Sequence, residues 1–419
     1  MNEKEFCKKI TGVVAPWEIS KIETDEAKKR VDVYLDYSKG KGKCPECNKS
    51  VPLYDEREER VWRHLDSCEY QTYLHCRMPR SNCAEHGIKT MEVPWSTSLS
   101  RFTISFERHA IDLLQATKNR SKSAKLLGIS WDEINGIMQR GVARGLDRRS
   151  STPIPYLSID EKSFLSGQSY VSVLSDPVGK RVLDVVEGRD IRAVLTLFGC
   201  LNRKQRRAVK AVSMDFWKAF ITVVSKILPA HKGRDKFHIM KYINEAVNSI
   251  RASEHKWRAK QKDAILTGTK YLWLKRLENF TDKDKKKWAE LNLDQLEVGK
   301  AWNLRELFNE FWNCENITSA RKFFKSWYYK VTHSGLEPMI KVAEMIKRHF
   351  ENIITWWRHQ ISNGYAEGIN SVIQEIKTVA RGFRNFQNYR TAMLFFLWKI
   401  RLVPTRKSVE PFLIRLQLL

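Results

Sequence analysis

Three acidic residues of this sequence stand where a metal ion could bind. Asp160 ends the apolar run that begins at Tyr156, and Asp215 ends the apolar run that begins at Ala208. Glu367 lies in a segment with the apolar period of a helix. Carboxylates that are brought close together repel one another unless a cation lies between them. The set is therefore typical of a site for a hard divalent metal.

The segment from Ile361 to Phe383 is expected to place Glu367 on a polar helix face, among amides and cations. The apolar stripe beside that face consists of Ala366, Ile369, Ile373, Ile376 and Ala380. Glycines on both sides of Glu367 each cost about 1 kcal/mol of helix stability, and they leave room for a close approach to the backbone. A solvated surface helix is the common meaning of such a pattern. The alternative is a metal-binding Glu367, with Lys377 and Arg381 along a phosphate backbone.

The residues around Asp160 and Asp215 predict an α/β core. Three strands separated by short turns indicate an antiparallel meander. A helical segment, a strand ending in Asp215, a second helix and a short strand follow. The expected segments are 156–160, 170–174, 181–186, 191–201, 208–215, 216–228 and 235–238. This order is that of a ribonuclease H-like fold, in which the first and fourth strands end side by side.

Addition of Glu367 to Asp160 and Asp215 gives a three-carboxylate cradle for two Mg²⁺ (or Mn²⁺) ions. One ion would activate an attacking water or 3′-hydroxyl, and the other would stabilise the leaving oxygen of a phosphoryl transfer. Taken alone, Asp160 is equally well explained as a turn or N-cap residue. The combination with the strand order favours the metal site.

The composition favours a polyanionic partner. The chain has 419 residues and a formal net charge of +26, with Lys and Arg spread along its whole length. Nucleic acid is the first expectation and an anionic membrane surface the second. The many aromatic residues argue against disorder. No apolar run of about 18 residues and no signal-peptide core occur, so a cytoplasmic protein is expected.

Four of the cysteines cluster in the N-terminal region and predict a structural zinc site. Cys44 and Cys47 form a CxxC knuckle, which places two thiolates on one edge of a tetrahedron. The second pair is spaced more widely. The expected ligands are Cys44, Cys47, Cys76 and Cys83, with His86 or His75 as a substitute. The alternative, a set of ordinary buried thiols, is less common when a CxxC is present.

From Ser105 to Leu146 the pattern predicts three helices. Gly128 ends the second of them and Ser130 caps the third. The spacing suits a helix-turn-helix whose last helix enters the major groove, although unrelated helical bundles share it. A basic flank favours DNA. The side chains expected to contact DNA are Lys122, Lys125, Trp131 and Arg140, with Lys377 and Arg381 farther along the chain.

The chain resembles bacterial insertion-sequence transposases of the ISL-three family, which are DDE enzymes with an N-terminal zinc finger. The resemblance rests on Cys44-Pro-Glu-Cys47, Arg63-His-Leu-Asp66, Ile159-Asp-Glu-Lys-Ser163, Gly188-Arg-Asp190, Val212-Ser-Met-Asp215, Asp235-Lys-Phe-His238, Asn363-Gly-Tyr-Ala-Glu-Gly-Ile-Asn370 and Gly382-Phe-Arg-Asn385. The element from Asn363 to Asn370 is the most specific. The chain departs from the family pattern at Phe216-Trp217 and at 231–234, where an apolar strand would be usual.

The resemblance implies that Asp160, Asp215 and Glu367 are the catalytic triad. Supporting residues near the metals are Asp235, His238, Asn363 and Asn370. The long interval between Asp215 and Glu367 implies an all-helical insertion, whose aromatic residues form its core or, less commonly, stack on unpaired bases. The expected domains are a zinc module (1–100), a helix-turn-helix (101–150), the first part of a ribonuclease H-like core (151–245), the insertion (246–350) and the core completion with a C-terminal helix (351–419).

These features predict a transposase that binds the inverted repeats of its element, cuts the strands and joins the 3′-hydroxyl ends to target DNA. A homodimer is expected, because two ends must be held at once, and a bacterial cytoplasmic location near the nucleoid. One alternative is an inactive zinc and helix-turn-helix regulator. The other is a structure-selective nuclease without strand transfer.

Overall fold

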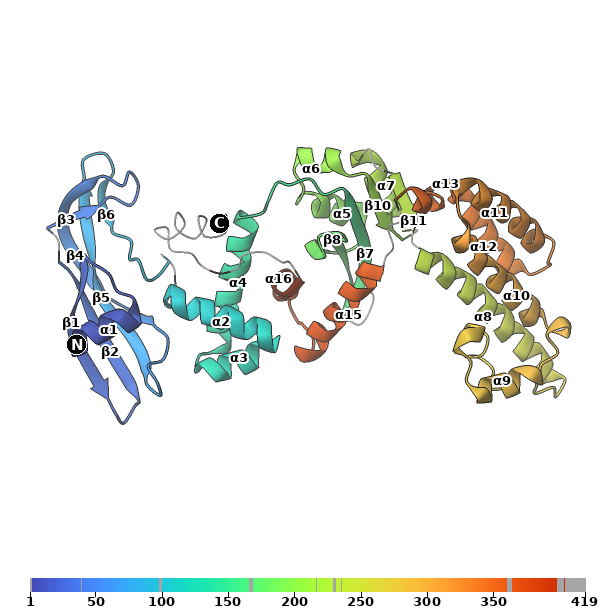
Figure 1. Ribbon diagram of the computed structural model, residues 1–419, viewed down its shortest axis with the longest axis horizontal. Coiled ribbons are helices and arrows are strands. Elements are labelled where there is room, and N and C mark those ends of the chain that lie inside the picture. Colours follow the sequence, from blue (N-terminus) through green and yellow to red (C-terminus); the bar gives the residue numbers. More distant parts are fainter. Residues whose placement is uncertain are drawn as a thin grey trace. The chain divides into compact units, whose positions relative to one another are not determined.

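The computed structural model in Figure 1 describes most of the chain. It covers residues 2–38, 40–97, 100–165, 169–215, 217–228, 231–234, 236–359, 364–397 and 403. Within these ranges the side chains of 165, 231–234, 236–238, 356, 358 and 364–367 are outside the description. The described residues form two compact units. The first comprises residues up to 149 together with 378–382, and the second comprises 150–377 and 383–397.

The first unit begins with a sheet of six strands. Its elements are α1 (Glu3–Thr11), β1 (Trp17–Asp25), β2 (Arg30–Tyr37), β3 (Lys41–Lys43), β4 (Ser50–Arg63), β5 (Gln71–Cys83) and β6 (Gly87–Thr90). The strand order is β1-β2-β5-β4-β3, and β6 pairs with β5. In β2 the buried residues Val33 and Leu35 alternate with less buried neighbours, as in a strand with one face on the core. Trp17, Trp62 and Trp95 pack edge to face in the core of this module.

Three helices follow in the first unit: α2 (Ile104–Thr117), α3 (Arg120–Leu127) and α4 (Trp131–Asp147). Gly128 ends α3 with a left-handed φ of 62°, a conformation in which a Cβ is unfavourable. Ser130 caps α4 in a reciprocal capping box with Glu133. Ala124 of α3 and Ile134 and Ile137 of α4 are buried. The three-helix prediction is confirmed.

The second unit is built on a mixed five-stranded sheet in the order β11-β10-β7-β8-β9. Its elements are β7 (Tyr156–Leu165), β8 (Ser169–Asp176), β9 (Arg181–Glu187), α5 (Ile191–Phe198), α6 (Arg203–Ala208), β10 (Ala211–Met214), α7 (Lys218–Ile227) and β11 (His231–Arg234). β7, β8 and β9 form the antiparallel meander. β10 pairs in parallel with both β7 and β11. Strands and helices therefore alternate in the predicted order.

One side of this sheet packs on α5 and α7. Leu157, Leu174 and Val212 meet Leu197 and Phe220 in a single apolar cluster. Side chains alternate along a strand, so Val173 and Val185, which are also buried, belong to the opposite face. Phe164 of β7 lies against Tyr389 of α16 (Phe386–Leu397), with ring centroids 4.9 Å apart. The sheet is thus covered by helices that come from distant parts of the chain.

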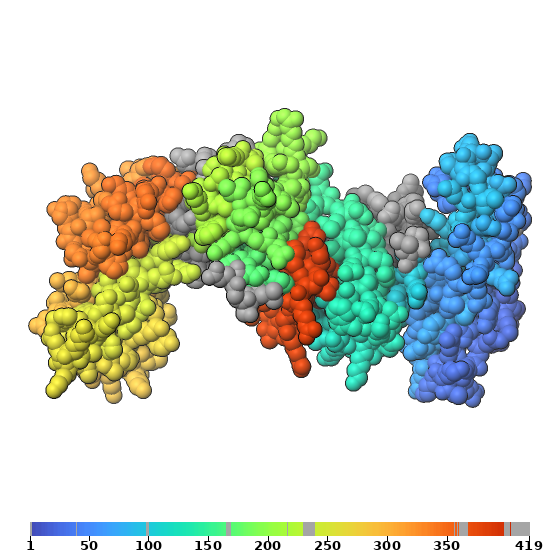
Figure 2. Space-filling model, turned by 180° about the vertical axis from the view of Figure 1, so that it is seen from behind, coloured from blue at the N-terminus to red at the C-terminus, as the bar shows by residue number. Residues whose placement is uncertain are grey.

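Between the sheet and α16 the chain forms a helical insertion (yellow to orange in Figure 2). Its elements are α8 (Lys236–Lys260), η1 (Leu277–Asn279), α9 (Asp282–Ala289), η2 (Leu293–Gln295), α10 (Glu297–Asn309), η3 (Glu310–Asn313), α11 (Ile317–Thr332), α12 (Glu337–Arg348), α13 (Phe350–Ile353) and α14 (Trp356–His359). Trp273 and Trp327 are completely buried, which confirms the core role of these tryptophans. The expectation of an all-helical insertion is wrong at Leu272–Arg276, which is a turn region.

Two further predictions about elements are wrong. The short strand expected at 235–238 lies earlier, as β11 at His231–Arg234, and Lys236–His238 already belongs to α8. Pairing with β10 makes this polar segment a strand, in spite of its sequence. The helix around Glu367 is α15 (Gly364–Val379), so Ala380 lies beyond its end and is exposed. Among the described residues no helix has the length and apolar character needed to cross a bilayer.

Candidate active site and zinc centre

Asp160 and Asp215 are neighbours because of the parallel pairing between β7 and β10. In this register Met214 lies opposite Ile159. Asp215 follows Met214, so it leaves β10 at the level at which Asp160 stands on β7. Adjacent strands are about 4.8 Å apart. The sequence prediction that these two carboxylates belong to adjacent strands therefore agrees with the observed register.

Asp160 is held by a residue of α15. The Nδ2 atom of Asn370 donates a 2.7 Å hydrogen bond to Oδ2 of Asp160. The other carboxylate oxygen accepts the backbone N–H of Glu161 at 2.8 Å, and the Nζ atom of Lys162 lies 3.7 Å from Oδ2. A carboxylate has about four lone-pair sites, so both oxygens keep capacity for a metal ion. Of the predicted supporting residues, Asn370 is the one whose contact with the site is described.

A second contact aligns α15 with β7. The Nζ atom of Lys377 donates to the carbonyl of Ser163 at 2.8 Å. Seven residues of helix and three of strand each span about 10 Å, so α15 runs beside β7 in the same direction. Lys377 was predicted to contact DNA, and this hydrogen bond gives it a structural role as well. Arg381 lies just beyond α15, exposed and with a positive φ of 52°.

Four predicted residues fall partly or wholly outside the described residues. Asp235 and Asn363 are not described, and the side chains of His238 and Glu367 are not described. The backbone of Glu367 belongs to α15, three residues before Asn370. Residues three apart on a helix share a face. Glu367 thus occupies a helix position one turn before the residue that binds Asp160.

Tyr242 of α8 is a contact of Asp215 that the sequence did not indicate. Burial raises the pKa of Tyr242 to about 12, and the charges of Asp215, Glu245 and Glu161 and a hydrogen bond with Asp215 act in the same direction. The phenol is therefore a neutral donor to the carboxylate. No sequence signal links these two residues, because the contact depends on where α8 leaves the sheet.

Arg189 forms a second polar cluster around Glu161, the neighbour of Asp160. Its guanidinium lies between the rings of Tyr170 and Trp217, 3.8 and 4.1 Å from their centroids. Its Nη1 atom is 3.1 Å from Oε2 of Glu161. The indole N–H of Trp217 donates to the carbonyl of Arg189 at 2.8 Å. The departure from the family pattern at Trp217 thus has a local function, since its ring stacks on Arg189.

Four residues of the N-terminal module can hold a tetrahedral metal. The ligand atoms of Cys44, Cys47, Cys83 and His86 all lie within 4.8 Å of one another. The sulfurs of Cys47 and Cys83 are 3.8 Å apart, and Nδ1 of His86 is 3.6 Å from the Cys83 sulfur. Tetrahedral zinc with ordinary bond lengths requires about 3.8 and 3.6 Å for these separations. The distances between the ligand atoms of this Cys₃His set therefore match a tetrahedral zinc site, which supports a structural Zn²⁺.

Cys76 is not part of this cluster, so the prediction that it binds zinc is wrong. It stands in β5 with its side chain in the apolar core of the module, and its thiol donates to the carbonyl of Arg77 at 3.2 Å. Burial raises the pKa of Cys76 to about 12, which opposes the thiolate that a metal needs. His86, considered as a substitute, takes the fourth place because the tight turn after Cys83 returns it to the cluster. His75 instead contacts Asp32 and Glu59.

Two of the cations expected to contact DNA lie on α3. Lys122 and Lys125 are exposed there, and Trp131 at the start of α4 is 40% exposed. Arg140, also predicted to contact DNA, has a partner within the bundle. Its Nε atom donates at 2.8 Å to Glu107, which is 1% exposed and is also 3.0 Å from Nη1 of Arg144. A buried carboxylate needs such partners, so Arg140 stabilises the three-helix bundle.

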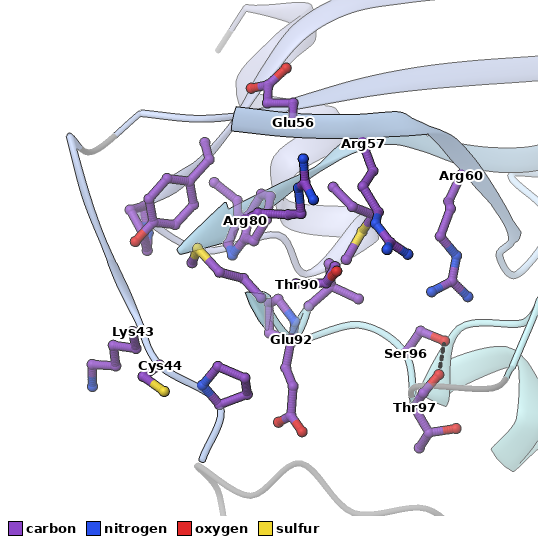
Figure 3. A pocket seen from close by; sticks show the side chains of 18 of the residues that line it. Lys43, Cys44, Glu56, Arg57, Arg60, Arg80, Thr90, Glu92, Ser96 and Thr97 are labelled. Atoms are coloured by element: carbon purple, nitrogen blue, oxygen red, sulfur yellow. Dashed lines mark hydrogen bonds between the residues drawn. The ribbon is translucent and has the colours of Figure 1, made fainter. Parts of the chain in front are cut away.

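A groove of about 1810 Å³ lies beside the zinc ligands in the first unit. Figure 3 shows Arg57 and Arg60 extending into it from β4, with Glu92 on the facing segment. Glu56, Glu58 and Glu59 belong to the same lining. Cations and carboxylates are therefore mixed, and the groove has no clear preference for a polyanion.

Comparison with models of known protein families shows the family to which the chain belongs. A family model described as transposase, of the ISL3 type, matches residues 157–393. The chain belongs to the ISL3 family of transposases. The zinc-finger model of transposases IS204, IS1001, IS1096 and IS1165 matches residues 40–86, and the helix-turn-helix model of transposase family ISL3 matches residues 91–142. The resemblance seen in the sequence is confirmed, and the zinc ribbon, helix-turn-helix and transposase regions follow in that order.

Individual ISL3 transposases are similar over most of their length. The transposase for insertion sequence element IS1001 of Bordetella parapertussis is 26% identical over 363 residues, which are 85% of this chain and 87% of that protein. The transposase for insertion sequence element IS1557 of Mycobacterium tuberculosis (strain H37Rv) is 23% identical over 373 residues, with coverage of 82% and 83%. As a member of this family, the chain is a nucleic-acid-processing protein.

Proposed function

We propose that the chain is a DDE transposase that cuts the ends of its own element and joins the freed 3′-hydroxyls to target DNA. The catalytic triad would be Asp160, Asp215 and Glu367, in a core of ribonuclease H-like fold. The observation that carries the proposal is the hydrogen bond from Asn370 to Asp160. It brings α15, the helix of Glu367, to the strand pair that holds both aspartates.

Glu367 would complete the site from one turn away. The helix rises about 1.5 Å per residue, so the backbone of Glu367 lies about 4.5 Å before Asn370 along the axis of α15. Because α15 runs beside β7, Glu367 lies within one helical turn of the level at which β7 and β10 bring the two aspartates together. A set of three carboxylates offers hard oxygen ligands, which suit Mg²⁺ or Mn²⁺.

The chain's own residues would position the substrate and these carboxylates. Bound Mg²⁺ ions would activate the attacking oxygen and stabilise the leaving one. Asn370 fixes the side chain of Asp160, and the Tyr242 hydroxyl fixes that of Asp215. Arg189, held between two rings, neutralises Glu161 beside the site. These partners would hold the acidic groups in place before the metal ions bind, when their mutual repulsion is largest.

The zinc ribbon and the helix-turn-helix would recognise the inverted repeats. Lys122 and Lys125 on α3 would contact phosphates and Trp131 the groove edge, and Arg381 would lie along the backbone of the same DNA. Binding of two ends would require a homodimer. Size-exclusion chromatography with light scattering of the protein bound to one end duplex tests this stoichiometry directly.

The function is tested on a plasmid that carries both element ends and a second plasmid as target. Glu367→Gln, Asp160→Asn and Asp215→Asn should each lower strand cleavage about 1,000-fold or more, because each removes a metal ligand. Glu375→Gln, on the exposed side of the same helix, is the matched control and should cleave normally. End binding should persist in all four variants.

Two results would favour other functions. A regulator with an inert core would bind the ends but show no cleavage in the unaltered protein, so Glu367→Gln would change nothing. A structure-selective nuclease would cut branched DNA irrespective of the end sequence and would give no joined product. Joined products that disappear in Glu367→Gln exclude both alternatives.

A further inference from the structure

The helical insertion contains a pocket of its own. Its volume is about 690 Å³, and it is lined by residues of α8, of the turn region before η1 and of α10. Sites for small organic ligands occupy about 300–1,000 Å³. None of the three proposed catalytic carboxylates lines it. The pocket is therefore a separate feature of the described structure.

Polar atoms without partners are concentrated on its wall. Arg305 is 3% exposed, and its two terminal nitrogens donate to the carbonyls of Lys275 and Leu274 at 3.0 and 3.2 Å. Its Nε atom has no acceptor among the described residues, and Oδ1 of Asn244 and of Asn309 has no donor there. Buried polar atoms are almost always hydrogen-bonded. One unpaired donor and two unpaired acceptors in one pocket indicate that these atoms form hydrogen bonds with a bound ligand.

The lining is strongly cationic. It contains five Lys or Arg residues and one carboxylate, that of Glu245. Lys275 and Arg276 are paired with Asp284 and Glu278. Lys241 and Lys270 form no ion pair with any residue that the structure describes, so they remain available to an anion. A phosphate group suits such ammonium groups.

A ligand that satisfies the whole pocket must combine several kinds of group. The two amide oxygens require donors, such as the exocyclic amine of a nucleobase, and Nε of Arg305 requires an acceptor. Free phosphate supplies acceptors alone. Met240 and Leu274 provide apolar surface for a flat ring. We infer that the pocket binds one unpaired nucleotide of a DNA strand, with the base inside and the phosphate against Lys241 and Lys270.

The position of the pocket on α8 connects it to the active site. Tyr242, which hydrogen-bonds to Asp215, stands on this helix one turn before Glu245, which lines the pocket and whose charge acts on Tyr242. A nucleotide in the pocket would therefore come from DNA that also reaches the carboxylates. This inference rests on the proposed function, since it assigns the pocket to the DNA that the active site cuts.

The test measures binding without any cleavage. Full-length Asp160→Asn protein is titrated, in the absence of divalent metal, with a duplex that carries one extrahelical adenine and with the same duplex carrying an abasic site there. The adenine duplex should bind about tenfold more tightly, which corresponds to 1.4 kcal/mol. Lys241→Ala and Asn244→Leu should each remove this preference. Lys256→Ala, an exposed lysine of α8 outside the lining, should keep it.

Three results would overturn the inference. They are equal affinity for the two duplexes, a preference that survives in both pocket variants, and binding of free dAMP without any preference for the extrahelical base. Lys241 is exposed, so its replacement tests the pocket even if the Asn244 variant folds poorly. The binding test does not depend on cleavage. If the unaltered protein cuts element ends but shows no preference for the extrahelical adenine, the inference about the pocket is wrong and the proposed function stands.

Discussion

The amide of Asn370 reaches across 210 positions of the sequence to Asp160, where it donates a 2.7 Å hydrogen bond. Both residues belong to motifs that carry the family resemblance, and the structure shows that these motifs meet. A hydrogen bond to a carboxylate oxygen fixes the orientation of the group. Asn370 therefore fixes the orientation of the Asp160 carboxylate, which in the proposed function binds a metal ion.

Replacement of Asn370 by Ala should lower strand cleavage about tenfold or more, since hydrogen bonds to charged groups contribute about 1.5–3 kcal/mol. The affinity for end DNA should stay unchanged, because Asn370 belongs to the proposed metal site and not to the helix-turn-helix. Gln387→Ala, an exposed amide on α16, is the control and should cleave normally. Equal cleavage by the Asn370 variant and the unaltered protein would contradict this role.

Tyr242→Phe should lower cleavage about tenfold, because Asp215 loses a donor. The substitution should also change the pH dependence of stability. Burial raises the pKa of Tyr242 to about 12 in the folded chain, above the ordinary value of 10.0. The resulting stabilisation is present below pH 10 and is lost as the pH rises through 12.

Urea unfolding of the unaltered protein and of Tyr242→Phe, at pH 9 and pH 11, tests this point. The free energy of unfolding should fall more steeply with pH in the unaltered protein, since it alone carries the titrating phenol at this position. Parallel pH dependences would mean that Tyr242 is not held in its neutral form by the fold.

The zinc assignment predicts that His86 binds the metal and that Cys76 does not. His86→Ala and Cys44→Ala should lose the bound zinc, measured as metal content per chain after dialysis. Cys76→Ala should keep a full complement of zinc and lose about 1–2 kcal/mol of stability, because it leaves a small cavity in the apolar core. Loss of zinc from the Cys76 variant, with zinc retained by the His86 variant, would show that Cys76 and not His86 is a zinc ligand.

In the helix-turn-helix, the basic residues that contact DNA should respond to mutation differently from the basic residue that stabilises the bundle. Lys122→Ala and Lys125→Ala should each reduce the slope of log affinity against log salt by about 1, as expected for a lost phosphate contact. Arg140→Ala should instead lower the thermal stability, because it leaves the buried carboxylate of Glu107 with fewer partners. A salt-slope change in Arg140→Ala, without loss of stability, would place this guanidinium on the DNA.

The periodic elements could be predicted from the sequence because their signals are local. Alternation predicted β7–β9, and Gly128 and Ser130 marked the helix boundaries at which α3 ends and α4 begins. The order of strands around Asp160 and Asp215 was sufficient to place these residues on adjacent strands. These predictions depend on period and on capping chemistry, which a short window contains.

Contacts between distant segments could not be predicted in the same way. The strand His231–Arg234 has no apolar pattern, and it is extended because β10 offers it a partner. The fourth zinc ligand depended on the tight turn after Cys83 and on the burial of Cys76, neither of which the spacing reveals. Arg140 looked like a surface cation, since its partner Glu107 lies 33 positions away.

The central claim is that Asp160, Asp215 and Glu367 bind the same metal ions. Titration of Mn²⁺ into the protein bound to end DNA, followed by electron paramagnetic resonance, tests it most directly. Each of Asp160→Asn, Asp215→Asn and Glu367→Gln should weaken Mn²⁺ binding about tenfold or more, and Glu375→Gln should bind like the unaltered protein. Unchanged Mn²⁺ binding in Glu367→Gln, with binding lost in the two aspartate variants, would contradict a site shared by all three carboxylates.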